Sequence, residues 1–509
     1  MDDAYSLISP AVSRQAASYT DQCPGCQRHW GDACGVFGIY APDQDVSRVT
    51  YFALYALQHR GQESAGIATW HPLEGMQHHK GVGLAFQVFS EDSLRELQGD
   101  AAIGHVRYST TGSSGLKNAQ PMFGEAKFGP FALGHNGNLV NTHKLRAELE
   151  RQGVEVPGTS DTAVMAELIS RSGADTLEEA IIEMMGIIEG AYSLVFLAPG
   201  KVVAVRDPYG VRPLCIGRLN GDDWVVASET CALHVIGADF VREVEPGEMI
   251  TIDANGFAAS QIIEPTRKAC CIFEFIYFAR PDSHIYGRSV YMSRQRMGHL
   301  LAQQAPVEAD LVIPVPESGI PHAMGYAAVS KIPYGEGFIK NRYIHRTFIA
   351  PDQRLRELGV KMKLTPLKEA VGGKRLVVVD DSIVRGTTTG PEIQLLRDAG
   401  AREIHLRINC PPLKYGCFYG VDTSAGPDEL IAARLSVEQI RDQLGADTLE
   451  YLTMKNLITA VGLPKNNFCT ACFDNQYPIP IPKELKAAKS GSQVFEDKQR
   501  VGVEQVPGS

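Results

Sequence analysis

Residues 377–389 read Val-Val-Val-Asp-Asp-Ser-Ile-Val-Arg-Gly-Thr-Thr-Thr, and this stretch says most about the fold. It predicts an apolar strand that ends in two adjacent carboxylates, Asp380 and Asp381, and passes through a small, hydroxyl-rich turn into a helix. Backbone N–H groups and hydroxyls at a helix start can cradle a phosphate. Two carboxylates beside that turn can hold ribose hydroxyls or a Mg²⁺ ion. A tight turn with capping Ser and Thr would explain the hydroxyls but not the adjacent aspartates, so we expect a phosphate site.

The surrounding sequence has the pattern of a parallel α/β sheet. Residues 311–315 and 375–379 are short, continuously apolar runs, each followed by a Gly-containing turn and a helical pattern. Such strands are typical of a parallel sheet that helices cover on both faces. Ligands of open α/β sheets bind at the carboxyl ends of the strands, where acidic and glycine residues are found here.

A different pattern occupies the chain before about residue 265. Short strand-like runs recur there, including residues 34–40, 191–197, 201–205 and 224–227. Helical patterns interrupt them at residues 161–170 and 176–188. Strands and helices in this order predict a layered α+β domain.

Length, charge and hydropathy narrow the class of protein. The 509 residues allow two or three domains, and a net charge of −10 argues against a nucleic-acid binder, which needs a basic excess. No apolar run approaches a membrane span, and the start Met-Asp-Asp lacks the features of a secretory signal. We therefore expect a cytoplasmic protein without a nucleic-acid or membrane partner, with a loose leader at residues 1–33 and a tail at residues 486–509.

Cysteine usage points to chemistry rather than to disulfides. Eleven cysteines are many for a reducing compartment, so catalysis, metal binding or burial must explain them. Cys23 with Cys26 and Cys469 with Cys472 form C-x-x-C pairs. Two thiolates alone do not complete a metal site.

Residues 377–389 resemble the phosphoribosyl-pyrophosphate (PRPP) signature of type I phosphoribosyltransferases. The resemblance implies that Asp380 and Asp381 contact the ribose hydroxyls and, together with Ser318, a Mg²⁺ ion. It implies that the following turn holds the 5′-phosphate, through Ser382, Arg385, Gly386, Thr387 and Thr388. Residues 316–319 resemble the loop that grips the pyrophosphate, with Glu317, Ser318 and Gly319.

A basic stretch lies between these two motifs. It contains Lys340 and Arg342 and continues to Lys363. A loop of this charge folding over the pyrophosphate would stabilise the leaving group and exclude water. Alone, the stretch would be interpreted as a solvated loop, but its place between two PRPP motifs favours the functional interpretation.

The chain from Cys34 onward resembles the mature start of N-terminal-nucleophile glutamine amidotransferases. In that family the cysteine must be the first residue, because its own α-amino group, with a pKa of about 8, serves as the general base. The thiolate then attacks the carboxamide and forms a covalent glutamyl intermediate. The resemblance implies an αββα sandwich over residues 34–265, with Cys34 as nucleophile, followed by a phosphoribosyltransferase domain over residues 266–485.

Further motifs of that family follow in the expected order, at residues 57–66, 104–110, 134–138 and 160–162. They imply that Arg107 binds the α-carboxylate of glutamine and that Asp161 binds its ammonium group. They also imply an oxyanion hole made by the Asn136 side chain and the Gly137 N–H. Taken alone, the Gly-His-Asn-Gly-Asn of residues 134–138 also fits a hairpin loop.

The leader departs from the family pattern. Residues 1–33 precede Cys34 and block its amine in the translated chain. The resemblance implies cleavage after Ala33, as in relatives made with a propeptide, although those leaders are shorter. Cys23 and Cys26 lie outside the family pattern. They could form a metal or redox element, but we expect them to be discarded with the leader.

Two further stretches complete a set of four cysteines. Residues 271–283 and 411–420 resemble segments that carry ligands in the iron–sulfur branch of the amidophosphoribosyltransferase family. The resemblance implies a [4Fe–4S] cluster on four thiolates, Cys271, Cys417, Cys469 and Cys472. From chemistry alone, four dispersed cysteines suit Zn²⁺ as well. Cys270 and Cys410 are assigned to packing.

The resemblance extends from Cys34 to about Tyr477 and implies two linked half-reactions. Glutamine is hydrolysed at Cys34, and the ammonia attacks C1 of PRPP to give 5-phosphoribosylamine and pyrophosphate, the first committed step of purine synthesis. A homotetramer inhibited by purine nucleotides is also implied. A hexosamine-phosphate synthase would share the first half only, and a PRPP-sensing regulator the second half only. PRPP-dependent release of pyrophosphate with glutamine separates the three.

Overall fold

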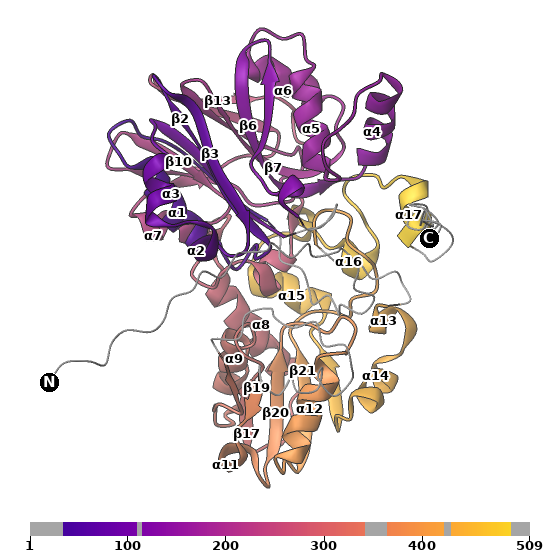
Figure 1. Cartoon of the computed structure of the whole chain (residues 1–509). Coiled ribbons are helices and arrows are strands. Elements are labelled where there is room, and N and C mark those ends of the chain that lie inside the picture. The colour runs from indigo at the N-terminus through magenta and orange to yellow at the C-terminus, as the bar shows by residue number, and fades with distance from the viewer. Residues whose placement is uncertain (1–33, 109–114, 342–363, 422–428, 490–509) are drawn as a thin grey trace, which may run out of the picture.

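The computed structural model describes residues 34–108, 115–341, 364–421 and 429–489. The expected leader, most of the basic stretch and the end of the tail lie outside these ranges. Figure 1 shows that the first half of the sequence forms the upper region of the molecule and the second half the lower region.

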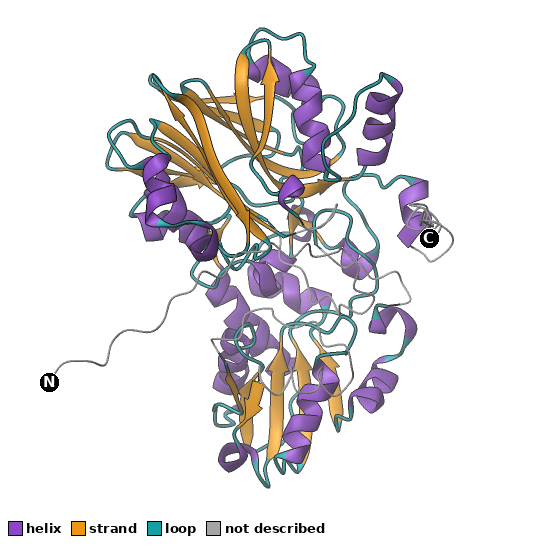
Figure 2. Ribbon diagram, in the orientation of Figure 1, coloured by secondary structure: helices purple, strands orange, loops and turns teal. Residues whose placement is uncertain are grey.

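Two antiparallel sheets make up the upper region (Figure 2). The first has the order β11 (Asp239–Glu243), β9 (Cys215–Leu219), β10 (Asp223–Ala227), β1 (Gly35–Tyr40), β4 (Ala101–Arg107), β2 (Ser64–His71) and β3 (Gly75–Val82). The second has the order β13 (Gly256–Gln261), β12 (Glu248–Asp253), β8 (Lys201–Arg206), β7 (Gly190–Ala198), β6 (Gly129–Leu139) and β5 (Met122–Ala126). Their facing sides share a fully buried core, to which Val36 and Ile103 contribute from the first sheet and Val195 from the second.

Helices cover the outer faces of both sheets. They are α1 (Val46–Ala56), α2 (Ala85–Val88), α3 (Glu91–Glu96) and α7 (Thr230–Ile236) on the first sheet, and α4 (Thr142–Arg151), α5 (Asp161–Ser170) and α6 (Leu177–Met185) at the second. Helix α5 begins where expected because the Ser160 hydroxyl accepts the Ala163 N–H (3.2 Å) as an N-cap. The layers are helix, sheet, sheet and helix, so the predicted αββα glutaminase fold is confirmed.

A parallel four-stranded sheet forms the lower region, in the order β17 (Leu311–Pro314), β20 (Arg375–Asp380), β21 (Glu403–Ile408) and β22 (Thr448–Tyr451). Val378 of β20 pairs with Ile313 on one side and with Leu406 on the other, and all three are buried. The surrounding helices are α8 (Val290–Gln304), α9 (Ile320–Ser330), α11 (Lys368–Val371), α12 (Thr389–Asp398), α13 (Ile431–Arg434), α14 (Val437–Leu444) and α15 (Met454–Val461). This is the parallel sheet predicted from the continuously apolar runs.

Short elements lie where the two regions meet and at the edges. They are β14 (Cys270–Cys271), a π-helix (Glu274–Phe278), β15 (His284–Ile285), β16 (Arg288–Ser289), β18 (Phe338–Lys340), β19 (Leu364–Pro366), β23 (Phe468–Cys469), α16 (Ala471–Asp474), α17 (Lys483–Lys489) and two 3₁₀ turns (Leu116–Asn118 and Lys465–Asn467). The tail was expected to begin at residue 486, but helix α17 continues past this position to Lys489. Over the described ranges, no helix is long and apolar enough to cross a membrane.

Candidate functional site

Cys34 lies directly before β1, against the end of β4. Its thiol donates to the Tyr108 carbonyl (3.3 Å), and the Tyr108 N–H lies 3.4 Å from the same sulfur. Burial raises the pKa of the Cys34 thiol to about 11, although the Tyr108 N–H and Arg107 oppose the shift. The thiol is therefore protonated near neutral pH and needs a base before it can act as a nucleophile.

Charged groups of both signs surround this thiol. Arg107 is 3% exposed and lies 3.5 Å from the Glu63 carboxylate, while Asp161 is buried at the start of α5. Burial alone would raise the pKa of Asp161, but His135 and two backbone N–H groups outweigh it and hold this pKa below its usual value. The predicted residues Cys34, Arg107 and Asp161 are thus brought together, because both charges act on the Cys34 sulfur.

The predicted oxyanion residues lie near the C-terminal end of β6, where Asn136 pairs with Ser193 and Gly137 with Tyr192 of β7. The hairpin-loop interpretation of residues 134–138 is therefore wrong, because long-range strand pairing decides their conformation. Asn136 is fully buried, and neither its Nδ2 nor its Oδ1 has a hydrogen-bond partner among the described residues. Buried amides are nearly always paired, so this side chain is available to a ligand.

Gly137 occupies a backbone position that other residues cannot take. Its φ is +149°, and a Cβ there would lie 2.0 Å from the Ala191 carbonyl oxygen. The glycine is thus required by the backbone as well as by any role of its N–H.

Sequence reasoning missed a buried arginine behind the nucleophile. Arg60 is 1% exposed and donates from Nε to the Cys34 carbonyl (3.1 Å). Its guanidinium is paired with two buried carboxylates, Glu229 and Glu274. Burial lowers the pKa of Arg60, but these carboxylates outweigh it and raise the pKa, so the arginine is charged. Arg60 belongs to the family stretch at residues 57–66, which was the available signal.

The two aspartates of the phosphate motif lie at the carboxyl end of β20, as predicted. Asp380 and Asp381 are both buried, and the Asp381 carboxylate accepts hydrogen bonds from Ser382 and Ser318. Burial, together with the charge of Asp381, raises the pKa of Asp380 well above its usual value. Excess buried negative charge of this kind suits a cation or a set of hydroxyl donors.

The pyrophosphate-loop candidates approach the same strand end. Gly319 packs so closely that a Cβ would lie 2.6 Å from the carbonyl oxygens of Val315, which follows β17, and Val379, the last residue but one of β20. Glu317 follows a cis peptide bond and lies 3.6 Å from Lys340. The strand ends therefore bring the residue 316–319 loop to the two aspartates.

The remaining phosphate-motif residues lead into α12. Gly386 has a φ of +74°, and Thr388 is the N-cap residue of the helix that begins at Thr389. Arg385 forms an ion pair with Glu429 (2.7 Å), so its guanidinium is paired with a carboxylate of the protein. Arg342 lies outside the described residues.

Two further residues near the aspartates were not predicted. Arg294 of α8 is buried, and burial lowers its pKa to about 10 despite the attraction of Asp381. Asn409 follows β21 and donates from Nδ2 to the Asp380 carbonyl (2.9 Å), while its buried Oδ1 has no partner among the described residues. Neither residue belongs to a local motif.

Cys271, Cys417, Cys469 and Cys472 line a single pocket between the two regions of the molecule. Cys271 and Cys469 are paired across β14 and β23, and the Tyr419 N–H donates to the Cys417 sulfur (3.3 Å). Apart from Arg212, the other lining residues are apolar or aromatic: Val211, Phe273, Tyr419, Val421, Ala471 and Tyr477. N–H···S bonds and a dry surrounding are what iron–sulfur thiolates require.

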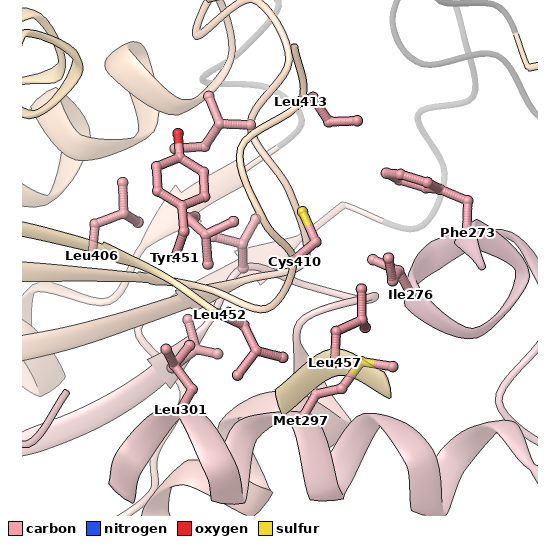
Figure 3. Close-up of a cluster of buried hydrophobic side chains, with 14 of the residues drawn as sticks. Phe273, Ile276, Met297, Leu301, Leu406, Cys410, Leu413, Tyr451, Leu452 and Leu457 are labelled. Carbon is pink, nitrogen blue, oxygen red and sulfur yellow. The ribbon is translucent and has the colours of Figure 1, made fainter. Parts of the chain in front are cut away.

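Within the described ranges, no three His, Cys, Asp or Glu side chains are arranged to hold a single metal ion. In a [4Fe–4S] cluster each thiolate would bind a different iron, whereas a Zn²⁺ site would need all four thiolates on one ion. The same finding applies at Asp380 and Asp381, where substrate oxygens and water would have to complete the coordination of Mg²⁺. Cys410 is fully buried among apolar side chains (Figure 3), in agreement with its assignment to packing.

Comparisons with known proteins agree with this geometry. Residues 105–235 match a glutamine amidotransferase domain family. The chain is 50% identical to the amidophosphoribosyltransferase of Mycobacterium tuberculosis, over 90% of this chain and 89% of the relative. A solved glutamine PRPP amidotransferase from B. subtilis, in complex with ADP and GMP, superposes with a TM-score of 0.84 at 47% identity, covering 89% of this chain and 98% of that one. A structure described as the allosteric regulatory enzyme of purine biosynthesis gives a TM-score of 0.85 at 46% identity, over 90% and 99% of the two chains.

Proposed function

Because the chain belongs to the amidophosphoribosyltransferase family, we propose that its two regions divide the family reaction between Cys34 and the Asp380–Asp381 pair. The enzyme hydrolyses glutamine and transfers the ammonia to C1 of PRPP, which yields 5-phosphoribosylamine, glutamate and pyrophosphate. This is the first committed step of purine synthesis.

Cys34 is the nucleophile in glutamine hydrolysis. Its thiol is protonated near neutral pH because burial raises its pKa to about 11, so the attack requires a base at the sulfur. An α-amino group on Cys34 itself, with a pKa of about 8, would supply that base once the Ala33–Cys34 bond is cleaved. Arg60 holds the Cys34 carbonyl and so limits the rotation of the residue that carries both groups.

The residues around Cys34 bind and polarise the substrate. Arg107 binds the α-carboxylate of glutamine, and the charged Asp161 binds its ammonium group. The unpartnered Asn136 amide and the Gly137 N–H stabilise the oxyanion that forms as sulfur attacks the carboxamide. The acyl intermediate is then hydrolysed to glutamate.

The lower region receives PRPP. Asp380 and Asp381 bind the ribose hydroxyls, and the turn from Ser382 to Thr388 binds the 5′-phosphate with its N–H groups and hydroxyls. Residues 317–319 and Lys340 bind the pyrophosphate. Mg²⁺ would lie on Asp380, Asp381 and Ser318, where it would neutralise charge on the leaving group.

The four-cysteine pocket holds a [4Fe–4S] cluster. Support comes from the donor set of four thiols, the N–H···S bond at Cys417 and the apolar lining. The cluster would supply a covalent cross-link between three segments of the chain, around Cys271, Cys417 and the Cys469–Cys472 pair, without a step in the reaction.

The proposal rests above all on the Cys34 thiol, which is buried against the Tyr108 backbone and whose pKa responds to the charges of Arg107, Glu63 and Asp161. The test uses protein purified without oxygen. The release of pyrophosphate from PRPP is measured with glutamine or with ammonium as donor, and the intact mass of the chain is measured by mass spectrometry. We expect activity with both donors and a chain that begins at Cys34. A chain that retains residues 1–33 yet uses glutamine would contradict the α-amine as base.

Iron content tests the cluster ligands. We expect about four irons per chain and visible absorption in the wild type, and loss of both in Cys469→Ala, because a methyl group cannot bind iron. The matched control is Cys410→Ala, which changes another buried cysteine outside the pocket and should retain the iron. Zinc in place of iron in the wild type, or equal iron in the two variants, would contradict the assignment.

Regulation, assembly and location are proposed from the family. We propose purine nucleotides as inhibitors, supported by the ADP and GMP in the B. subtilis relative, and a homotetramer in the cytoplasm. Light scattering with and without a purine nucleotide would test the assembly, and a monomer in both conditions would contradict the tetramer. Pyrophosphate release with and without the nucleotide would test the inhibitor, and an unchanged rate would contradict it.

A further inference from the structure

The segment Cys417–Gly420 lies between the four-cysteine pocket and the glutamine site. Cys417 lines the pocket, and each of the three residues after it contacts the upper region. The contacts fall into two groups, one toward the oxyanion strand β6 and one toward Cys34.

Toward β6, the segment contacts Gly137, one of the two oxyanion residues, and its neighbour Asn138. The Asn138 side chain donates from Nδ2 to the Phe418 carbonyl (2.9 Å). Gly420 lies so close to Gly137 that a Cβ on it would be 2.9 Å from the Gly137 carbonyl carbon and 3.0 Å from its oxygen. Gly420 also has a φ of +98°. The backbone of Gly137 is therefore held between β7 on one side and Gly420 on the other.

Toward Cys34, a chain of buried charges connects two backbone carbonyls. Arg212 donates to the Tyr419 carbonyl from Nε (3.0 Å) and Nη2 (2.9 Å), and its Nη1 lies 3.2 Å from Glu274. Glu274 in turn accepts two hydrogen bonds from Arg60 (2.8 and 3.0 Å). Arg60 donates to the Cys34 carbonyl (3.1 Å).

This chain of charges resists displacement. Arg60, Arg212 and Glu274 are buried to within 1% of full burial. Breaking a buried ion pair leaves an uncompensated charge in a low-dielectric interior, so the three side chains keep their geometry together. A displacement of the Tyr419 carbonyl would therefore also displace the Cys34 carbonyl.

We propose that residues 417–420 position the glutamine site: the pocket anchors the segment at Cys417, and the segment holds Gly137 through Gly420 and the Cys34 main chain through Tyr419. None of the four is among the residues proposed above to bind glutamine, so they are positioning residues. The inference rests on the proposed roles of Cys34 and Gly137. It assigns to the cysteine pocket a function in glutamine hydrolysis that is separate from PRPP chemistry.

The test is Gly420→Ala, which adds one methyl group against Gly137. We expect kcat for glutamine hydrolysis to fall about 10- to 100-fold with little change in KM, since small misplacements at a reacting centre have effects of this size. Ammonia-dependent synthesis, iron content and visible absorption should stay at wild-type values, because the methyl group points at β6 and not at the pocket. The Asn136→Ala variant, which removes the oxyanion amide itself, sets the upper limit of the effect at about 10²- to 10³-fold.

Gly237→Ala is the matched control. Gly237 ends α7 with a φ of +74°, and a Cβ there would meet no atom within 4 Å, so the variant carries the backbone strain without the contact. The milder Asn138→Ala removes the hydrogen bond to Phe418 and should lower kcat in the same direction; it serves if Gly420→Ala does not fold. The inference would be overturned if Gly420→Ala and Asn138→Ala both hydrolysed glutamine as fast as Gly237→Ala. It would also be overturned if they lost ammonia-dependent synthesis and iron in parallel with glutamine hydrolysis. A wild type without ammonia-dependent synthesis would instead refute the proposed function.

Discussion

The Cys34→Ala variant is expected to lose glutamine-dependent synthesis by at least about 10³-fold while ammonia-dependent synthesis continues at the wild-type rate. The loss follows because Cys34 is the thiol on which the charges of Arg107 and Asp161 act, and alanine has no nucleophile to replace it. Ammonia needs no cleavage, so its route to PRPP does not depend on Cys34. Pyrophosphate release with each donor, measured on the same preparation, gives both rates.

A matched control separates nucleophile loss from loss of a buried thiol. Cys215 is also buried in the upper region, where its Sγ lies 3.3 Å from the Ala227 carbonyl on the neighbouring strand. Cys215→Ala should keep both activities. If Cys34→Ala retained glutamine-dependent synthesis, or lost both activities together, the assignment of the nucleophile would be wrong.

The second large effect is expected at Asp381. The Asp381→Asn variant should lose synthesis with both donors by about 10²- to 10³-fold, because an amide is a far weaker ligand for hydroxyls and Mg²⁺ than a carboxylate. Glutamine hydrolysis without PRPP should continue, since Cys34 and its partners are untouched. Two rates are measured. Pyrophosphate release reports phosphoribosylamine synthesis, and glutamate release reports glutamine hydrolysis.

The stability of the folded Asp381→Asn variant should increase or stay unchanged, although its activity falls. The charge of Asp381 raises the pKa of Asp380, so removing it relieves repulsion between two buried carboxylates and lowers that pKa. The melting temperature of Asp381→Asn should therefore not fall. Asp398→Asn, at the exposed end of α12, is the control and should keep full activity. A fall in melting temperature that accompanies the loss of activity would indicate a structural role for Asp381 instead.

Local sequence was sufficient for most of the framework. The apolar run before Asp380 predicted the buried parallel strand β20, and the small residues after it predicted the turn into α12. Ser160 marked the start of α5 through its hydroxyl cap. These features depend on contacts within a few residues, so propensity and periodicity carry the information.

The hairpin-loop alternative for residues 134–138 failed because distant pairing decided the conformation. The Gly-His-Asn-Gly-Asn stretch contains good turn residues, yet pairing with β7 makes it the interior of a strand and leaves Asn136 buried without a partner. A turn propensity worth a fraction of a kcal/mol does not outweigh a whole ladder of strand hydrogen bonds.

The sequence by itself thus determined the two fold types, the order of the motifs and the residues expected at both sites. Only the tertiary structure decided that Arg60 holds Cys34, that Arg60 and Arg212 share Glu274, and that Gly420 presses on Gly137. Arg60 and Cys34 are 26 residues apart in the sequence, Arg212 and Glu274 are 62 apart, and Arg60 and Glu274 are 214 apart. Which buried charge meets which, and which glycine allows two backbones to touch, follows from how the two regions dock, and no local pattern encodes that.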